Sequence, residues 1–232
     1  MASDPRPFKR RAFLKAATVA PLALAGEAHA APSGLAASQF PHTVEALRGA
    51  FQIETAAHLN YVPFARRAVA ESLPNIAYLF QAFSISEKQH ADNYQVVLGK
   101  LGVDIVPAEV KVVVGTTREN LRLAAQRELD KIKQVYPSLL QALEGEHCDE
   151  AIVNAMYSMK SHQQHEEQVT QIERYAGMFF SAVADDIEAR KLDFHICRVC
   201  GSTINSAPTG PCVICNRSRR NYVRVERPKA AS

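Results

Sequence analysis

Hydrophobic residues recur at helical spacing through most of the chain, in four segments separated by shorter stretches rich in polar residues, proline or glycine. In the first, residues 42–71, the apolar side chains follow the pattern of one buried helix face. They are Val44, Leu47, Phe51, Ala57, Leu59 and Val62. Similar patterns run from 74 to about 102, from 116 to about 143 and from about 148 to 176. The pattern therefore predicts four long helices.

Residues that begin, bend or end helices flank these segments. Pro63 is expected to kink or loosen the first helix, and Pro74 suits the first turn of the second. Gly102 follows the end of that second helix. Thr116 and Glu119, three residues apart, form the pattern of a capping box at the start of the third. These signals place helix boundaries where the apolar pattern stops.

The stretch 103–115 is a longer crossover of extended character between the second and third helices. Four long helices with one long crossover predict an all-α fold, a four-helix bundle over residues 42–177. A linker over 31–41 precedes the bundle, and a second linker over 178–194 follows it. Residues 195–232 form a separate small domain with a basic tail.

The small domain has few apolar residues and many turn formers, so a segment of roughly 35 residues needs a covalent or metal staple. Two Cys-x-x-Cys hooks supply one: Cys197, Cys200, Cys212 and Cys215. Two such hooks complete a tetrahedron of thiolates, which favours a metal site over disulfides. A tetrahedral set of four thiolates binds either zinc or iron. Zinc would make the domain a structural ribbon, and iron would make it a one-electron relay. Cys148 stands outside this pattern.

The N-terminal segment 1–30 has the pattern of an export signal. Arg10 and Arg11 precede an alanine-rich apolar run, and Ala30 ends a site suited to signal peptidase. The run is shorter than the roughly 20 residues that span a bilayer. The segment resembles a twin-arginine signal, although Lys9 replaces the usual Ser or Thr. We therefore expect export by the twin-arginine machinery, to the periplasm or otherwise outside the cytoplasm, with no membrane span after cleavage.

Composition and charge narrow the function classes. The chain has 232 residues, 47% hydrophobic and 22% charged, which suits one sizeable core and a small appendage. The net charge is only +3, and much of the basic excess lies at the two ends. A phosphate-binding footprint should be a patch on the folded body. We therefore expect no nucleic-acid partner.

Each predicted helix carries a carboxylate or histidine that suits a metal site. Glu87 and His90, and again His162 and His165, lie three residues apart on one helix face. Glu54 and Glu128 sit among apolar neighbours, where an unpaired carboxylate is costly. The alternative is that both glutamates point outward and that the polar run at 161–168 is a solvated face. Four helices with such residues favour a site for two metal ions.

Together these residues resemble the rubrerythrin family, which has a ferritin-like bundle followed by a rubredoxin-like domain with four cysteine ligands. The resemblance covers roughly residues 42–226. The matching positions are Glu54, Tyr61, Glu87, His90, Glu128, Tyr136, Pro137, His165 and the four cysteines. It implies two iron ions in the bundle, with tyrosines 61 and 136 beside them, and one iron, or zinc, on the cysteines. It also implies a head-to-tail homodimer.

Two positions depart from the family pattern. Lys131 replaces a third-helix glutamate, and His162 replaces a fourth-helix glutamate. Each change removes a negative charge, and a lysine nearby adds a positive one. We hypothesise that the site favours reduced or lower-charge metal states, or a mixed or different metal pair. The alternative is that Lys131 turns away or pairs with a glutamate.

Two classes of function follow. The first is a non-haem di-iron oxidoreductase of the peroxidase type, which reduces hydrogen peroxide or another small oxidant. Electrons from an unidentified donor would pass through iron in the four-cysteine site. The second is a non-enzymatic metal-binding or sensing protein with a degenerate bundle site and a structural zinc ribbon. Lys131 and His162 are the features that favour the second.

Overall fold

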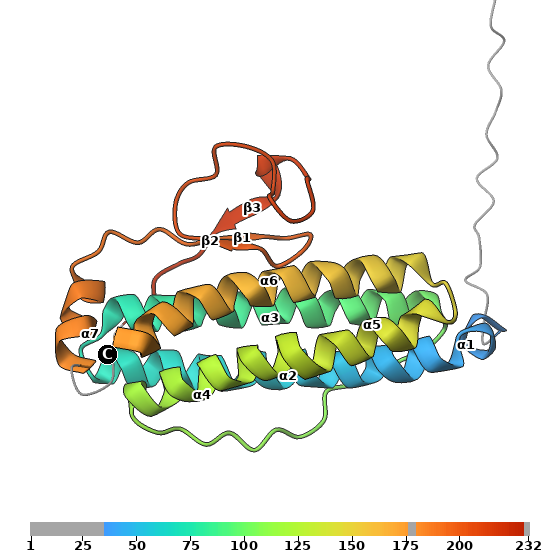
Figure 1. Cartoon of the computed structure of the whole chain (residues 1–232), viewed down its shortest axis with the longest axis horizontal. Coiled ribbons are helices and arrows are strands. Elements are labelled where there is room, and N and C mark those ends of the chain that lie inside the picture. Colours follow the sequence, from blue (N-terminus) through green and yellow to red (C-terminus); the bar gives the residue numbers. More distant parts are fainter. Residues whose placement is uncertain (1–34, 176–179, 230–232) are drawn as a thin grey trace, which may run out of the picture. The chain divides into compact units, whose positions relative to one another are not determined.

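The computed structural model describes residues 35–175 and 180–229, and most of them form a bundle of long helices (Figure 1). The export signal proposed over 1–30 lies outside the described residues. A short helix α1 (Leu35–Gln39) precedes the bundle. The bundle helices are α2 (Pro41–Ala70), α3 (Pro74–Lys100), α4 (Thr117–Asp130) with α5 (Tyr136–Glu144), and α6 (Asp149–Tyr175). The four predicted helical segments are confirmed.

Polar side chains fix where these helices start. Thr116 and Glu119 form the predicted capping box at the start of α4. In the first turns of α2 and α3, the N–H groups that have no partner within the helix are capped by glutamates from distant segments. Glu146 accepts from the start of α2, and Glu188 accepts from the start of α3. Such bonds satisfy donors that a helix leaves unpaired. Helix α2 runs on through Pro63 without a break.

A π-helical turn, Lys131–Val135, joins α4 to α5. The N–H of Tyr136 bonds to the carbonyl of Lys131, five residues back. A π turn accommodates one extra residue and often marks a functional position. Here both Lys131 and Tyr136 are buried inside the bundle. The apolar pattern predicted a continuous helix and gave no sign of this turn.

The crossover between α3 and α4 has no helix or strand over residues 103–115. The side-chain amide of Gln52 fastens it to α2. Its Nε2 donates to the carbonyl of Val106 at 2.9 Å, and its Oε1 accepts from the N–H of Ala108 at 2.7 Å. The loop therefore lies along the outside of the bundle.

The bundle interior consists of two apolar clusters with a polar layer between them. One cluster is centred on Phe64, Phe80 and Phe83, and the other on Leu47 and Leu98. The layer between them contains Glu54, Glu87, His90, Glu128, Lys131, His162 and His165, all buried. Burying so many ionisable groups is unfavourable unless they pair or bind metal. The layer is therefore the first candidate for a functional site.

The small domain is a three-stranded antiparallel sheet in the order β2-β1-β3. Its strands are β1 (His195–Cys197), β2 (Thr203–Ile204) and β3 (Tyr222–Arg224), with a 3-10 turn at Arg219–Asn221. Figure 1 shows the sheet beside α3 and α6. Helix α7 (Phe180–Glu188) lies in the stretch proposed as a linker and packs Ile187 into the first apolar cluster. This helix was not predicted.

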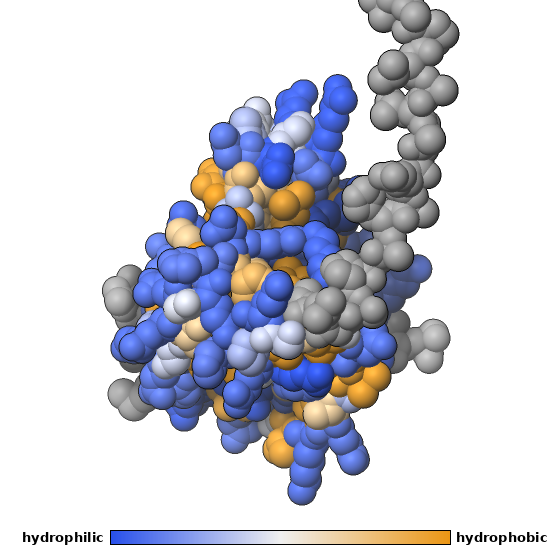
Figure 2. Space-filling model, turned by 90° about the vertical axis from the view of Figure 1, so that its right-hand side faces the viewer, coloured by the Kyte–Doolittle hydropathy of each residue, from blue (hydrophilic) through white to orange (hydrophobic). Residues whose placement is uncertain are grey.

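The surface is mainly hydrophilic, with scattered hydrophobic side chains, on the face that Figure 2 shows. Among residues 35–175 and 180–229, no helix is both long and apolar enough to cross a membrane.

Candidate metal centres

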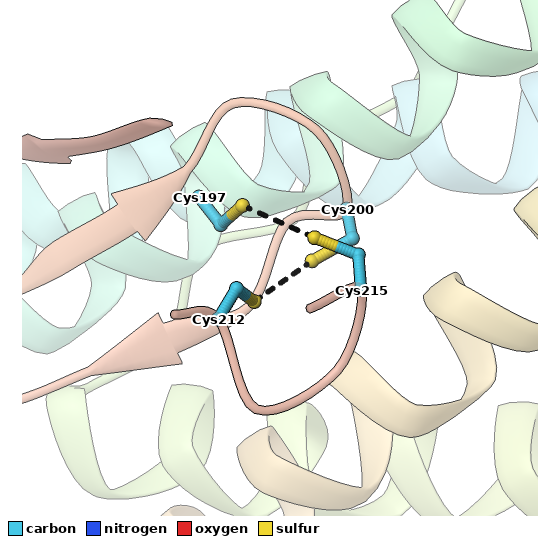
Figure 3. Close-up of side chains that lie close together, drawn as sticks. All are labelled: Cys197, Cys200, Cys212 and Cys215. Carbon is cyan, nitrogen blue, oxygen red and sulfur yellow. Dashed lines mark hydrogen bonds between the residues drawn. The ribbon is translucent and has the colours of Figure 1, made fainter. Parts of the chain in front are cut away.

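The four cysteines of the small domain converge on one point (Figure 3). The Sγ atoms of Cys197 and Cys215 lie 3.7 Å apart, and those of Cys200 and Cys212 lie 3.5 Å apart. A tetrahedral ion with metal–sulfur bonds of about 2.3 Å holds its sulfurs about 3.8 Å apart. All four are free and buried. The predicted four-cysteine cluster is therefore present and fits one tetrahedral ion such as iron or zinc.

The two hooks have the same backbone design. In each, the residue after the second cysteine has a positive φ, 77° at Gly201 and 55° at Asn216. Its N–H donates to the carbonyl of the first cysteine of the hook at 2.9 Å. The thiols of Cys197 and Cys200 lower the pKa of Cys212 well below its usual range. The contacts among the sulfurs leave the pKa values of Cys197 and Cys200 raised. Because metal ligands must be thiolates, binding of an ion would release the protons of these two thiols.

The polar layer of the bundle brings all six predicted ligand residues together. They form two overlapping groups whose ligand atoms lie within 4.8 Å of one another. The group that we call the Glu54 cluster contains Glu54, Glu87, His90 and His162. The group that we call the Glu128 cluster contains Glu87, Glu128, His162 and His165. The alternative that Glu54 and Glu128 point outward is therefore wrong.

Four atoms of the Glu128 cluster face one another. His162 Nδ1 lies 2.7 Å from Glu128 Oε2 and 3.7 Å from Glu87 Oε1. His165 Nδ1 lies 3.4 Å from Glu87 Oε1 and 3.5 Å from Glu128 Oε2. Nitrogen and oxygen ligands at about 2.1 Å from a tetrahedral ion would be about 3.4 Å apart. Three of these four separations are close to that value, and a divalent ion would fit once the 2.7 Å contact between His162 and Glu128 lengthened.

In Glu128, Glu87 and His165, the polar atom that faces away from the cluster has a hydrogen-bond partner of its own. Tyr61 OH donates to Glu128 Oε1 at 2.7 Å, and His90 Nδ1 lies 3.0 Å from Glu87 Oε2. His165 Nε2 lies 3.0 Å from the hydroxyl of Thr203. Such outer bonds fix the orientation of metal ligands. Tyr61 therefore lies beside the site, as the resemblance implied.

Both carboxylate oxygens of Glu54 already have hydrogen-bond partners. Its Oε1 accepts from Tyr136 OH at 2.6 Å and lies 3.1 Å from His162 Nε2. Its Oε2 accepts from Lys131 Nζ at 2.7 Å. The same ammonium lies 3.3 Å from Glu87 Oε1 and 3.9 Å from Glu128 Oε1. Of the alternatives for Lys131, the structure has it turned inward and paired with glutamates.

The acidic and basic groups of the layer stabilise one another's charged forms and so shift their pKa values. Burial alone would raise the pKa of Glu128, but Lys131 and His162 outweigh it and hold that pKa below its ordinary value. Burial would lower the pKa of Lys131, but the three carboxylates raise it. For His162, the carboxylates outweigh burial and Lys131, and its pKa rises to about 10. Burial raises the pKa of Tyr136, so its hydroxyl stays a donor.

The two centres touch through the loop after Cys200. The carbonyl of Gly201 accepts from the hydroxyl of Ser86 at 2.7 Å and of Ser161 at 3.1 Å. A methyl group on Gly201 would lie 2.2 Å from His90 Nε2, so only glycine fits. Neither serine was among the predicted site residues. Their signal was the shared spacing Ser-x-x-x-His, which recurs at 86–90 and 161–165.

Comparison with known proteins agrees with this architecture. The family model described as Rubrerythrin matches residues 45–173. Rubrerythrin-2 of Clostridium acetobutylicum is 31% identical over 187 residues, which are 78% of this chain and 95% of that protein. Nigerythrin of Nitratidesulfovibrio vulgaris is 26% identical over 187 residues, 78% of this chain and 85% of the relative.

Solved structures show the same fold. A fully reduced, all-ferrous nigerythrin superposes with a TM-score of 0.66 at 23% identity, covering 78% of this chain and 86% of that one. The bacterioferritin of Desulfovibrio desulfuricans gives 0.58 at 18% identity, covering 67% and 91%. The predicted fold, a ferritin-like helical bundle with a small four-cysteine domain, is confirmed. The chain belongs to the rubrerythrin family.

Proposed function

We propose that this chain is an exported oxidoreductase that reduces hydrogen peroxide in the polar layer of the bundle. Proteins of its family are di-iron proteins and typically act as oxidoreductases. The reaction consumes one peroxide, two electrons and two protons and yields two waters. The O–O bond breaks, and the electrons come from a reduced electron-transfer protein by way of iron on the four cysteines. The protons come from solvent.

The observation that carries this proposal is the contact between the two centres. Cys200 is bonded to Gly201, whose backbone lies against His90. Thr203, two residues further on, holds His165 by a hydrogen bond. The path from Cys200 to His165 therefore consists of a short stretch of backbone and one hydrogen bond, and His90 lies against the same stretch. Such a contact suits a one-electron relay better than a zinc ribbon.

The surrounding side chains suit peroxide chemistry. Iron in the layer would supply reducing equivalents and polarise a bound oxygen. Tyr61 and Tyr136 have raised pKa values because of burial, so each keeps its proton and its hydrogen bond to a glutamate. Phe83 stacks on His165 with ring centroids 4.3 Å apart and excludes water from one side. A dry, oriented layer strengthens electrostatic stabilisation of the reaction.

Anaerobic mixing tests the proposal. The full-length protein, loaded with iron and reduced, is mixed with hydrogen peroxide, and we expect fast peroxide loss together with the visible colour of oxidised iron thiolate. Protein with zinc on the four cysteines is the control and should not turn over. Peroxide loss no faster than with free ferrous iron would contradict the proposal. Zinc on the cysteines of the native protein would favour the metal-binding or sensing alternative.

Export is a separate part of the proposal and rests on the sequence of residues 1–30. Replacing Arg10 and Arg11 together by lysine should keep the protein in the cytoplasm, measured by cell fractionation. Export that is unchanged in this variant would rule out the twin-arginine route.

The homodimer implied by the resemblance stays a prediction. Within one chain the two centres already touch through Gly201, so the relay does not require a second copy. Light scattering measures the oligomeric state directly.

A further inference from the structure

The polar layer has an unusual charge balance. Within the described residues it holds three buried carboxylates and one buried ammonium, that of Lys131. A histidine that binds a metal ion is neutral, so in the metal-bound layer the histidines add no charge and two negative charges remain. One divalent ion neutralises them, whereas two divalent ions would leave an excess of two positive charges. An uncompensated charge in a buried site is strongly unfavourable.

The Glu128 cluster shows where one ion would sit. Glu87 Oε1 and His165 Nδ1 are buried without a hydrogen-bond partner, although they lie only 3.4 Å apart. Buried polar atoms are normally satisfied, so two unsatisfied atoms that face each other need an explanation. Both belong to the four atoms of the Glu128 cluster that face one another, at the separations of 2.7–3.7 Å given above. An ion at their centre would satisfy both.

The far-side contacts agree with this position. In each of the four side chains, the second polar atom is held by a neighbour: Tyr61, His90, Glu54 and Thr203 fulfil this role. In particular, His162 Nε2 faces Glu54, which leaves Nδ1 for the ion. Glu54 then acts as the carboxylate that orients a ligating histidine, a common arrangement at metal sites.

The Glu54 cluster also has one buried atom without a hydrogen-bond partner, His90 Nε2, but this atom lies against Gly201 and Glu54 itself is already paired. Lys131 Nζ lies 2.7 Å from Glu54 Oε2, and Tyr136 and His162 contact the other oxygen. A second ion on Glu54 would have to displace the ammonium from a buried ion pair. The lysine therefore stands where a carboxylate-bound cation would otherwise be.

We propose that the bundle binds one divalent metal ion tightly, at the Glu128 cluster, and that the ammonium of Lys131 replaces a second ion at the Glu54 cluster. The site is thus asymmetric, with one metal ion and one fixed organic cation. This differs from the pair of iron ions that the family resemblance implies.

The inference does not depend on peroxide reduction. Metal stoichiometry is measured without turnover, so a bundle with one tight ion and no peroxidase activity would support the inference and contradict the proposed function. Two tight ions with full activity would do the reverse.

Ferrous titration is the test. Full-length protein with its four-cysteine centre occupied is stripped of other metal by a soluble chelator and titrated with Fe²⁺ without oxygen. We expect one tightly bound ion per chain. A second ion should bind at least about 100-fold more weakly, because it must displace a buried ammonium.

Charge-reversal variants provide the matched comparison. Lys131→Glu should bring the affinity for the second ion to within about tenfold of the first. Lys133→Glu makes the same charge change in the same π-helical turn at an exposed position, and should bind one ion like the wild type. Two tight ions in the wild type, or one in Lys131→Glu, would overturn the inference.

Histidine variants keep the test decisive if Lys131→Glu does not fold. His165→Gln should abolish the tight ion, because His165 belongs to the Glu128 cluster alone. His90→Gln, which belongs to the Glu54 cluster alone, should retain it with at most about tenfold weaker affinity, since His90 supports Glu87 from outside. Loss of the ion in His90→Gln with retention in His165→Gln would contradict the assignment, as would a wild type that binds none.

Discussion

The two metal centres of this chain are built in opposite ways. The four-cysteine centre takes all its ligands from residues 197–215, on two hooks of the same design. The bundle layer takes its residues from helices far apart in the sequence, between Glu54 and His165. Around the first lie the small sheet and a few partly buried side chains, among them Tyr157 of α6 and Tyr222. The second is enclosed by two apolar clusters and held by a network of hydrogen bonds.

The difference shows where each centre obtains its stability. In the small domain the metal holds the fold, because its few apolar residues cannot. In the bundle the helices hold the site, because the apolar clusters on both sides fix the side chains before any ion binds. Lys131 extends this principle, since part of the positive charge is supplied by the protein itself.

The largest effect should come from removing one thiolate. Structural metal sites contribute about 10–16 kcal/mol to folding, so Cys212→Ser should empty the four-cysteine centre and unfold residues 194–226. The bundle should keep its helices. Metal analysis and far-UV circular dichroism measure both effects. Cys148→Ser, at a half-buried cysteine outside the cluster, should leave the metal content unchanged.

A methyl group at the contact between the centres should have the next largest effect. Gly201→Ala adds a Cβ 2.2 Å from His90 Nε2 at a residue with φ 77°, and should destabilise the protein by about 1–3 kcal/mol. Peroxide reduction should slow at least about tenfold, since the centres separate. Gly210→Ala, with no atom within 4 Å of its new Cβ, is the control. Equal melting temperatures in both variants would show that the contact is not tight.

Alkaline pH should weaken the bundle layer once its ion is removed. The pKa of His162 is raised to about 10 from an ordinary value of 6.5. The stability that this gives is complete below about pH 6.5 and is lost as the pH rises through about 10. Thermal melts should therefore show the wild type losing more stability than His162→Gln over this range. Parallel curves for the two proteins would contradict the ion pairs of His162.

The smallest effects should come from single hydroxyl groups. Tyr136→Phe removes a fully buried bond of 2.6 Å to Glu54 and should cost about 1–2 kcal/mol in unfolding free energy. Tyr222→Phe removes a bond of 3.2 Å to Ser202 from a half-buried ring beside the cysteines and should cost about 0.5 kcal/mol or less. A larger loss of unfolding free energy in Tyr222→Phe than in Tyr136→Phe would contradict the expectation that the buried hydrogen bond contributes more.

Local features of the sequence predicted most of the fold. Helix segments, the capping box at Thr116 and the cysteine hooks each depend on neighbours a few residues away, and each was predicted. The convergence of Glu54, Glu128 and the paired motifs also followed, because a carboxylate on an apolar helix face points toward the core.

Features that depend on distant contacts were not predicted. The π-helical turn reflects packing that turns both Lys131 and Tyr136 inward, which no apolar pattern records. Helix α7 does have apolar residues at helical spacing, Phe180, Ala184 and Ile187, but we predicted a linker over this stretch, and the bonds of its Glu188 to the start of α3 link distant segments. The direction of Lys131 was left open, because its choice between solvent and the three carboxylates depends on the whole layer.

The loop after Cys200, which lies against the bundle, affects how fast a bound ion can exchange. Gly201 and Thr203 lie against His90 and His165, and serine hydroxyls on two helices hold the carbonyl of Gly201. An ion that passes through this face can move only while the loop is lifted. The exchange rate of labelled metal through this face is then limited by the opening rate of the small domain. A chelator that takes the ion from the cysteines should speed release of the ion from the bundle as well.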